Sequence, residues 1–208
     1  HQEIDGRGEN FFDWEVTPDY CKKLAEAFGV SVFFQWKDGG FKREMLRCNE
    51  RTAKIFYECP DNTIHSVGGE KGKYSTRLKF PQPSPNLNVR WCSSYLKIDV
   101  CAAAIRNQER FNGLRTLVLS GERGEESKQR AGYAILEPDK SDLRHGKKIV
   151  RYVDRYRPIR DWTERRIWDL LEKYRVKPHP CYFMGFGRCS CKFCIFGNAN
   201  QFASAACI

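Results

Sequence analysis

The sequence predicts an α/β fold in which helices flank a parallel β-sheet, and three segments carry this prediction. Residues 17–29 are typical of a helix and are followed at once by a β-branched and aromatic run of strand length, 30–34. Residues 114–120 are predicted to form a buried strand that runs directly into a Gly-containing turn. A last amphipathic helix is expected over 163–175. Helices that alternate with strands favour parallel pairing, because parallel strands need crossover connections.

The helix signals stand early and late in the chain. Thr17 and Pro18 supply an N-cap and a Pro at the first helical position, and Gly29 supplies a stop. The i, i+3, i+4, i+7 spacing of a buried stripe is formed by Cys21, Leu24, Ala25 and Phe28. Helical spacing returns at Ile98, Cys101, Ala102 and Ile105. Thr163 is expected to cap the last helix, and 149–153 is expected to be a further strand.

The segment 49–88 departs from this regularity. It is rich in Gly, Pro, Ser and charge and has little periodicity. At this length we expect a lid or a partner-binding excursion rather than an inert loop, with disorder as the competing interpretation. The predicted organisation is therefore an α/β domain over 1–175, with 49–88 as an excursion, and a Cys-rich C-terminal segment over 176–208.

Charge favours an anionic partner. The 208 residues carry 36 Lys and Arg against 26 Asp and Glu, a net charge of +10. The stretch 144–177 holds twelve Lys and Arg against five Asp and Glu, which is +7 of that excess. Such a concentration favours a nucleic acid or a polyphosphate, although a solvated basic helix face is the alternative. No apolar stretch is long enough to span a membrane and no secretory signal opens the sequence, so we expect a cytoplasmic protein without a membrane partner.

Ten cysteines are present, and they are clustered. Four fall within fourteen residues, at Cys181, Cys189, Cys191 and Cys194. In a chain with no secretory signal, such spacing indicates metal or redox chemistry in a reducing compartment. Three interpretations stay open, namely a metal or iron–sulfur site, a redox dithiol and structural thiols. One gap of a single residue is tight for adjacent ligands, so two further thiols are alternates, Cys92 and Cys207.

The turn after the 114–120 strand is a candidate phosphate site. A strand that ends in such a turn lies at the carboxyl edge of a parallel sheet, where open α/β folds bind ligands. Arg guanidinium groups suit bidentate recognition of phosphate or sulfate, and Glu126 would orient one of them or bind a metal. The other candidate groups of this turn are Ser120, Gly121, Arg123, Ser127 and Arg130. A polar surface turn with local ion pairs is the competing interpretation.

A second candidate anion site is the segment 90–97. Arg90 and Lys97 flank the Cys92 thiol and two hydroxyl groups just before a helix. Free N–H donors and the partial positive charge of a helix N-terminus favour an anion there. The same field is expected to lower the pKa of Cys92 and favour its thiolate. The alternative is that Cys92 is a buried small apolar residue.

These segments together resemble the PAPS reductase-like branch of the adenine-nucleotide α-hydrolase superfamily, which includes the PP-loop ATP pyrophosphatases. Residues 121–127 match its G-x-R-x-x-E-S motif, and 90–97 match its R-W/F-C-T/S-x-x-L-K element. Residues 157–168 resemble its P-I-x-x-W-T helix, and 179–194 resemble its P-x-Y-x-x-G…C-x-x-C ending. Four motifs in the right order are far more specific than any one of them.

The resemblance implies a five-stranded parallel sheet of Rossmann type, flanked by helices, that binds ATP or an adenylyl sulfate. It places Arg123, Ser127 and Lys97 at the phosphate or sulfate end of the nucleotide. It also favours a [4Fe–4S] cluster over zinc at the cysteines. The DNA phosphorothioation proteins of the Dnd and Ssp types look most similar.

Two departures from the family pattern stand out. The PP-loop, S-G-G-x-D-S after the first strand, is absent, and residues 1–3 resemble the end of a second strand. We therefore expect the strand, loop and helix that carry it to lie outside this sequence, and the alternative is that the protein has lost them. Second, Cys207 lacks the E-C-G-x-H/L context of the catalytic Cys of true PAPS reductases.

The function expected from the resemblance is an ATP pyrophosphatase-type enzyme in sulfur transfer, acting in DNA phosphorothioate modification. Mg²⁺ would neutralise the leaving pyrophosphate, and the expected catalytic residues are Arg123, Lys97 and Glu126. DNA or DNA-modification proteins, and a cysteine desulfurase, are the expected partners. The alternatives are an assimilatory PAPS or APS reductase that releases sulfite, a non-catalytic nucleic-acid-binding iron–sulfur module, and a zinc-stabilised regulatory subunit.

Overall fold

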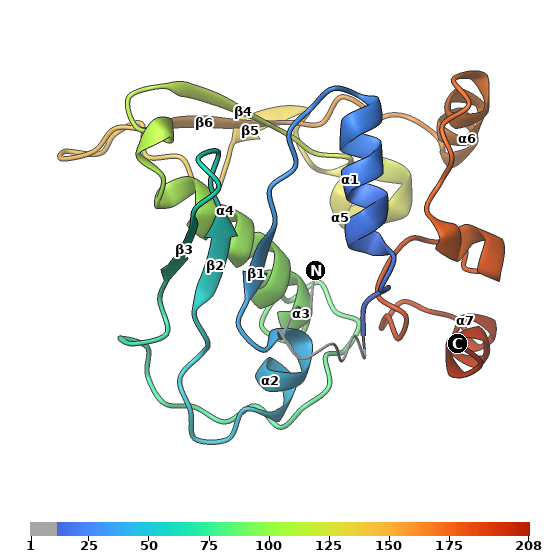
Figure 1. The fold of residues 1–208 in the computed structure, drawn as a ribbon, viewed down its shortest axis with the longest axis horizontal. Helices are drawn as coiled ribbons and strands as arrows, with labels where there is room; N and C mark the ends of the chain where they lie inside the picture. The colour runs from blue at the N-terminus through green and yellow to red at the C-terminus, as the bar shows by residue number, and fades with distance from the viewer. Residues whose placement is uncertain (1–11) are drawn as a thin grey trace. The chain divides into compact units, whose positions relative to one another are not determined.

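The computed structural model describes residues 12–208, and the chain divides into two units. One unit combines the residues up to 104 with 179–208, and the other comprises 105–178. Both contain helices and strands, so the α/β class is confirmed (Figure 1). The strand end expected at residues 1–3 lies outside the described residues.

The first unit opens with the predicted helix. α1 spans Thr17–Ala27 with Pro18 in its first turn, and the chain leaves it through Gly29 at φ +61°. The strand expected at 30–34 is displaced, because β1 spans Gln35–Lys37. Only these later residues have a partner strand, since Gln35 pairs with Tyr57 and Lys37 with Ile55.

The unit contains an antiparallel sheet of order β1-β2-β3, whose strands lie side by side in Figure 1. β2 (Ile55–Glu58) and β3 (Ile64–Val67) form a hairpin within the 49–88 segment. Along the chain, β1 is followed by α2 (Gly40–Leu46) and then by β2.

A buried ionic cluster ties the later part of this segment to α2. Glu44 is 1% exposed, and its carboxylate contacts Arg47 at 3.2 Å and Arg77 at 2.9 Å. Thr52 donates a hydrogen bond to the same carboxylate at 3.3 Å. A buried carboxylate needs such partners, because an unpaired charge in the interior is costly.

An aromatic core anchors the helical segment that follows. Phe12, Phe41 and Trp91 form one buried cluster, in which the Phe12 and Phe41 rings stack at 3.7 Å. Trp91 begins the short helix α3 (Trp91–Ser93), which continues into a π-helical turn, η1 (Ser94–Ile98), and then into α4 (Asp99–Arg106). The helix expected from the apolar spacing at 98–105 is therefore confirmed.

The C-terminal segment belongs to the same unit. It comprises the 3₁₀ helix η4 (Pro180–Met184) and α7 (Ala199–Ala206). A second core cluster joins them to the start of the described chain and contains Trp14, Cys181, Phe186 and Ala205. The indole N–H of Trp14 donates to the carbonyl of Ser190 at 2.7 Å.

The 105–178 unit holds a three-stranded sheet of order β4-β6-β5. β4 (Arg115–Leu119) lies within the strand predicted at 114–120. It runs parallel to β6 (Tyr152–Tyr156). The strand expected at 149–153 begins instead at Tyr152. Short 3₁₀ turns, η2 (Glu109–Phe111) and η3 (Gly124–Glu126), precede and follow β4.

The five-stranded parallel sheet is not found in residues 12–208, which contain two three-stranded sheets. β5 (Leu136–Pro138) pairs antiparallel with β6. The reason is its connection, which returns to β6 without a helix and is closed by an antiparallel bridge between Leu143 and Arg151. Parallel pairing would need a crossover there.

Two helices complete this unit. α5 (Lys128–Ala131) follows the turn after β4, and α6 spans Glu164–Lys173. Thr163 caps α6 as predicted, because its side chain accepts a hydrogen bond from the N–H of Arg166. None of the helices in residues 12–208 is long and apolar enough to cross a membrane.

Candidate functional site

The turn after β4 carries the predicted phosphate-binding residues, and its arginine is enclosed by carboxylates. The Arg123 side chain is 13% exposed and contacts Glu125 at 2.7 Å, Glu126 at 3.6 Å and Glu164 at 3.8 Å. The backbone N–H of Glu164 also donates to Glu125 at 2.6 Å. An incoming phosphate would therefore have to replace these carboxylates around the guanidinium.

The other residues of this turn satisfy one another. Glu126 is also paired with Arg130, so its carboxylate orients two arginines. The Ser127 hydroxyl caps α5 by accepting from the N–H of Arg130 at 3.2 Å. Ser120 donates a hydrogen bond to Glu122 at 3.0 Å. A Cβ atom added at Gly121 would lie at ordinary van der Waals distance from its neighbours, so the structure there does not require a glycine.

Arg157 is a central residue of this unit to which the sequence assigned no role, although it lies in the P-I-x-x-W-T element. It is 4% exposed and donates to Glu122 at 2.6 Å, Glu137 at 2.7 Å and the carbonyl of Ala134 at 2.8 Å. Its guanidinium also lies over the Tyr133 ring. These contacts join the turn after β4 to β5 and β6, so the residue has a structural role.

In the other unit, Cys92 does not have the lowered pKa that was predicted. Burial raises its pKa, and the nearby charge of Lys97 lowers it only in part. The desolvation of the thiolate outweighs the attraction because Cys92 packs beside the core formed by Phe12, Phe41 and Trp91. The expectation of a favoured thiolate was therefore wrong.

Arg90 has one buried donor to which no acceptor among the described residues is hydrogen-bonded. Its Nε atom is buried and has no hydrogen-bond partner among residues 12–208. Its guanidinium lies 5.9 Å from the ring centroid of Phe196, and Arg188 lies 5.3 Å from the same centroid. A buried donor without an acceptor is costly, and an anion would satisfy it.

The charge of Lys97 acts on several thiols of the same unit, including those of Cys92 and Cys191. Burial raises the pKa of Cys191 to about 12, while the charge of Lys97 opposes that shift and Asp13, Cys194 and Cys92 reinforce it. We call Cys92, Cys191 and Cys194 the Lys97 thiol group. Its members interact electrostatically across the start of η1 and the C-terminal segment.

A second group contains two of the predicted cysteines and a histidine that the sequence analysis did not propose as a ligand. The possible ligand atoms of His179, Cys181 and Cys189 all lie within 4.8 Å of one another. We call these residues the His–Cys–Cys group. Its only sequence signal was the position of His179 directly before the P-x-Y element.

The four predicted cysteine ligands are not all gathered around the position of one ion. Within residues 12–208, the His–Cys–Cys group is the one set of three or more potential metal ligands that are gathered this closely, and it contains Cys181 and Cys189 but not Cys191 or Cys194. Cys207 follows α7 and is exposed. The thiolates that hold a [4Fe–4S] cluster bind different iron atoms and lie farther apart than ligands of one ion, so a cluster held by the four thiolates stays a prediction.

Comparison with known proteins identifies the family. The model of the phosphoadenosine phosphosulfate reductase domain matches residues 21–196. The chain belongs to this family. Membership in the phosphoadenosine phosphosulfate reductase family supports a sulfur-transfer or nucleotide-related role.

One relative extends this similarity to a phage protein. It is described as an uncharacterized 37.8 kDa protein in the gpa 5′ region of Escherichia phage 186, and it is 29% identical over 123 residues. The match covers 57% of this chain and 34% of that protein, so the chain spans about a third of its relative. No solved structure matches the chain significantly.

Proposed function

We propose that this chain is part of an ATP pyrophosphatase-type enzyme that activates an acceptor for sulfur insertion, with DNA phosphorothioate modification of the Dnd or Ssp type as its setting. The observation that carries the proposal is the electrostatic interaction of Lys97 with the thiols of Cys92 and Cys191 in a domain of the phosphoadenosine phosphosulfate reductase family. A cation suited to nucleotide phosphates and groups able to handle sulfur then belong to one unit.

The proposed reaction has two steps. An oxygen of the acceptor attacks the α-phosphorus of ATP, the bond between the α and β phosphates breaks, and pyrophosphate leaves. A sulfide-level sulfur nucleophile then displaces AMP from the activated acceptor, which gains sulfur in place of oxygen. ATP arrives as its Mg²⁺ complex, and cations stabilise the charge that develops on the leaving group.

Lys97 and Arg90 are the residues best prepared to meet phosphate in their unit. The Lys97 side chain is exposed, and the Arg90 Nε has no acceptor among the described residues. In the other unit, the residues proposed to bind phosphate are those of the turn after β4, namely Arg123, Ser120, Gly121, Ser127 and Arg130. Glu126 would then hold Arg123 and Arg130 in position until phosphate oxygens replace it.

The proposed partners follow from charge and chemistry. DNA suits the basic stretch 144–177, since Lys and Arg side chains that neutralise phosphates dominate the affinity of such proteins for DNA. A cysteine desulfurase is the class of partner that would supply sulfur. The proposed location is the cytoplasm, where free thiols persist.

The test uses the full-length protein under anaerobic conditions, incubated with ATP and separately with PAPS. Pyrophosphate from ATP without sulfite from PAPS would support the proposal, and DNA would be the next substrate. Sulfite from PAPS would instead assign an assimilatory reductase, an alternative that the family match favours. Neither product would favour a nucleic-acid-binding module without turnover.

Lys97→Ala provides the matching variant. Removing one group that stabilises developing charge typically lowers turnover about 100-fold or more. Because Lys97 is exposed, the fold should be unaffected. Lys71→Ala is the control, since Lys71 is exposed in the same unit but lies in the excursion. Equal turnover in the two variants would remove Lys97 from the mechanism.

A further inference from the structure

We propose that His179, Cys181 and Cys189 bind a Zn²⁺ ion, at a site separate from the Lys97 thiol group. The proposal does not depend on the proposed function, because it concerns metal content and not turnover. It replaces a cluster held by four thiolates with a mixed site of one imidazole and two thiolates.

The spacing of the three ligands suits zinc. Tetrahedral Zn²⁺ with Zn–S bonds of about 2.3 Å and Zn–N bonds of about 2.0 Å places its ligand atoms about 3.5 to 3.8 Å apart. The three ligand atoms already lie within 4.8 Å of one another, and the Cys181 and Cys189 thiols are hydrogen-bonded. A contraction of about 1.3 Å at most would complete the geometry.

The hydrogen bonds of His179 indicate which nitrogen would bind zinc. Its Nδ1 atom accepts a hydrogen bond from the backbone N–H of Cys181 at 3.2 Å, so Nδ1 is unprotonated. The neutral ring must then carry its proton on Nε2, which lies 3.1 Å from the Thr17 hydroxyl and donates to it. Nδ1 has a single lone pair, so zinc bound there would replace the N–H of Cys181 as its partner. Metal-bound histidines commonly have such an oxygen partner on the other nitrogen.

Two ligands are fixed by the core and one faces solvent. Cys181 is 0% exposed within the Trp14 and Phe186 cluster, and His179 is 4% exposed. Cys189 is exposed, and its backbone N–H donates to the Tyr182 hydroxyl at 3.1 Å. The site is thus held rigidly on one side and accessible to an ion on the other, with a fourth position for water or an external ligand.

The buried carboxylate of Asp13 interacts electrostatically with the group. Asp13 is 5% exposed, and its Oδ2 atom has no hydrogen-bond donor among residues 12–208. Burial raises the pKa of Asp13, while the charges of Lys97 and His179 oppose that shift. The charges of Asp13 and Lys97 also act on Cys189 in opposite directions. An ion with two thiolates is neutral as a whole and adds no net negative charge to this interior.

The choice of metal follows from the ligand set. Tetrahedral sites of imidazole nitrogen and thiolate sulfur are typical of Zn²⁺, whereas iron–sulfur clusters are held mainly by thiolates. The competing use of the two thiols is a disulfide between Cys181 and Cys189, which would exclude zinc and would form only under oxidising conditions.

The experiment measures zinc bound to the full chain, purified under reducing conditions, stripped with a chelator and titrated with Zn²⁺ alone. We expect one equivalent bound by the native protein. Cys189→Ser should lower the affinity at least tenfold, and circular dichroism should show an unchanged fold because Cys189 is exposed. Cys48→Ser is the matched control, since Cys48 is an exposed thiol of the same unit that lies outside the group.

A second pair of variants tests the hydrogen-bond argument. Thr17→Val removes the acceptor for the Nε2 proton and should weaken zinc about tenfold, whereas Thr17→Ser should restore it. The proposal is overturned if Cys189→Ser binds zinc as the native chain does. It is equally overturned if Cys194→Ser, and not Cys189→Ser, abolishes binding, because the ion would then belong to the Lys97 thiol group.

Discussion

At the scale of single residues, buried arginines hold the 105–178 unit together. Arg157 joins the turn after β4 to β5, and Arg151 donates to the carbonyl of Ser141 at 3.0 Å and to Asn112 at 2.9 Å. Both guanidinium groups use several donors at once, in directions that a lysine cannot reproduce. Their replacement should therefore affect stability rather than chemistry.

We expect Arg157→Lys to lower the free energy of unfolding by about 2 kcal/mol, because buried acceptors lose their donors. Urea denaturation of the full chain, followed by fluorescence, measures the change. Arg165→Lys, on the exposed surface of α6, is the control and should leave the midpoint unchanged. Equal midpoints in both variants would contradict a structural role for Arg157.

Asp142 is predicted to couple stability to acid pH. Hydrogen bonds from the Arg144 side chain, and from the backbone N–H groups of Val153 and Arg144, lower its pKa from 3.8 to about 2. Because the pKa is lower in the folded state, the stabilisation is present above about pH 4 and is lost as the pH falls toward 2.

Asp142→Asn should remove this dependence. The native chain should be more stable than the variant at neutral pH, and the difference should narrow between pH 4 and pH 2. Unfolding curves collected across that range measure it. A difference that stays constant with pH would show that the carboxylate charge is not the source.

The sequence could indicate which residue types matter but not how they are paired. It singled out Arg123 for phosphate, and the structure surrounds that guanidinium with three carboxylates, two of which lie in the same motif. It assigned Cys92 a favoured thiolate, because flanking charges are visible in a sequence whereas burial in an aromatic core is not. Desolvation depends on residues distant in the chain, such as Phe12 and Phe41.

At the scale of elements, α7 depends on a capping box. The Asn198 side chain accepts from the N–H of Gln201 at 2.9 Å, and the Gln201 side chain accepts from the N–H of Asn198 at 3.0 Å. This reciprocal pair begins a helix whose Ala205 belongs to the core cluster around Cys181.

We expect Asn198→Ala to destabilise this region by about 1 kcal/mol, the usual effect of losing an N-cap. Asn198→Asp keeps an acceptor and should retain most of the stability. Hydrogen exchange of the α7 amides reports the local change directly. Identical protection in both variants would show that packing alone holds the helix.

Helices were predicted more accurately than strands, and the cause is local. Apolar spacing indicates α1 and a Thr163 cap indicates α6 within single segments, and both helices are found, although α1 follows Val16 and the predicted cap Thr17 is its first residue. A strand needs a partner. The β-branched run predicted a strand at 30–34, but the strand begins at Gln35, where the pairing with Tyr57 begins. The antiparallel pairing of β5 depends on the connection between β5 and β6, and residue propensities do not predict it.

At the scale of the whole molecule, the charge distribution predicts salt-dependent binding to DNA. Arg165→Glu combined with Lys173→Glu should reduce affinity for a duplex oligonucleotide and lower the salt slope by about 2, because each phosphate contact contributes about 0.9. Fluorescence anisotropy at several salt concentrations measures both quantities. Lys71→Glu with Lys73→Glu reverses the same charge among the exposed residues of 49–88 and is the control. Equal effects would indicate net charge rather than a binding surface.

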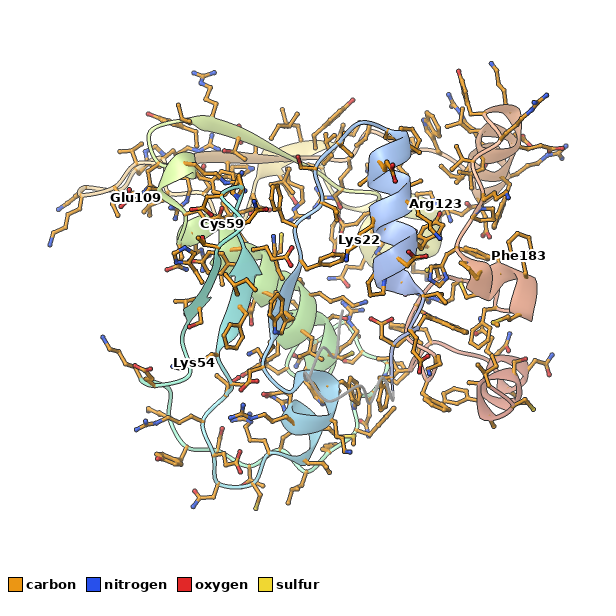
Figure 2. All side chains as sticks on the ribbon, viewed as in Figure 1. Lys22, Lys54, Cys59, Glu109, Arg123 and Phe183 are labelled. Carbon is orange, nitrogen blue, oxygen red and sulfur yellow. The ribbon has the colours of Figure 1, made fainter. Side chains whose placement is uncertain are left out.

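The distribution of cysteines over the molecule also explains the limits of the sequence analysis. Cys59 lies at the β2–β3 hairpin, whereas Phe183 marks the C-terminal segment that contains the clustered thiols (Figure 2). Four cysteines close in sequence suggested one site. Between Cys181 and Cys191 the chain passes through η4 and the turn at Gly185, and the two thiols pack against different core clusters. Cysteine spacing indicated the kind of chemistry, whereas the packing around Trp14 and Phe12 determines which thiols lie together.

The π-helical turn at Ser94–Ile98 lets the chain hold an additional residue without turning its flanks. Such a turn holds one residue more than an α-helix needs, and each residue of an α-helix turns the chain by about 100°. If the same residues formed a regular α-helix, Trp91 and Cys92 would rotate by about 100° relative to α4, and the indole would leave Phe41. Deleting Ser94 would instead convert the turn to a regular α-helix and leave both flanks facing as they do. The wide turn thus fixes which side of the helical segment Trp91 and Cys92 occupy.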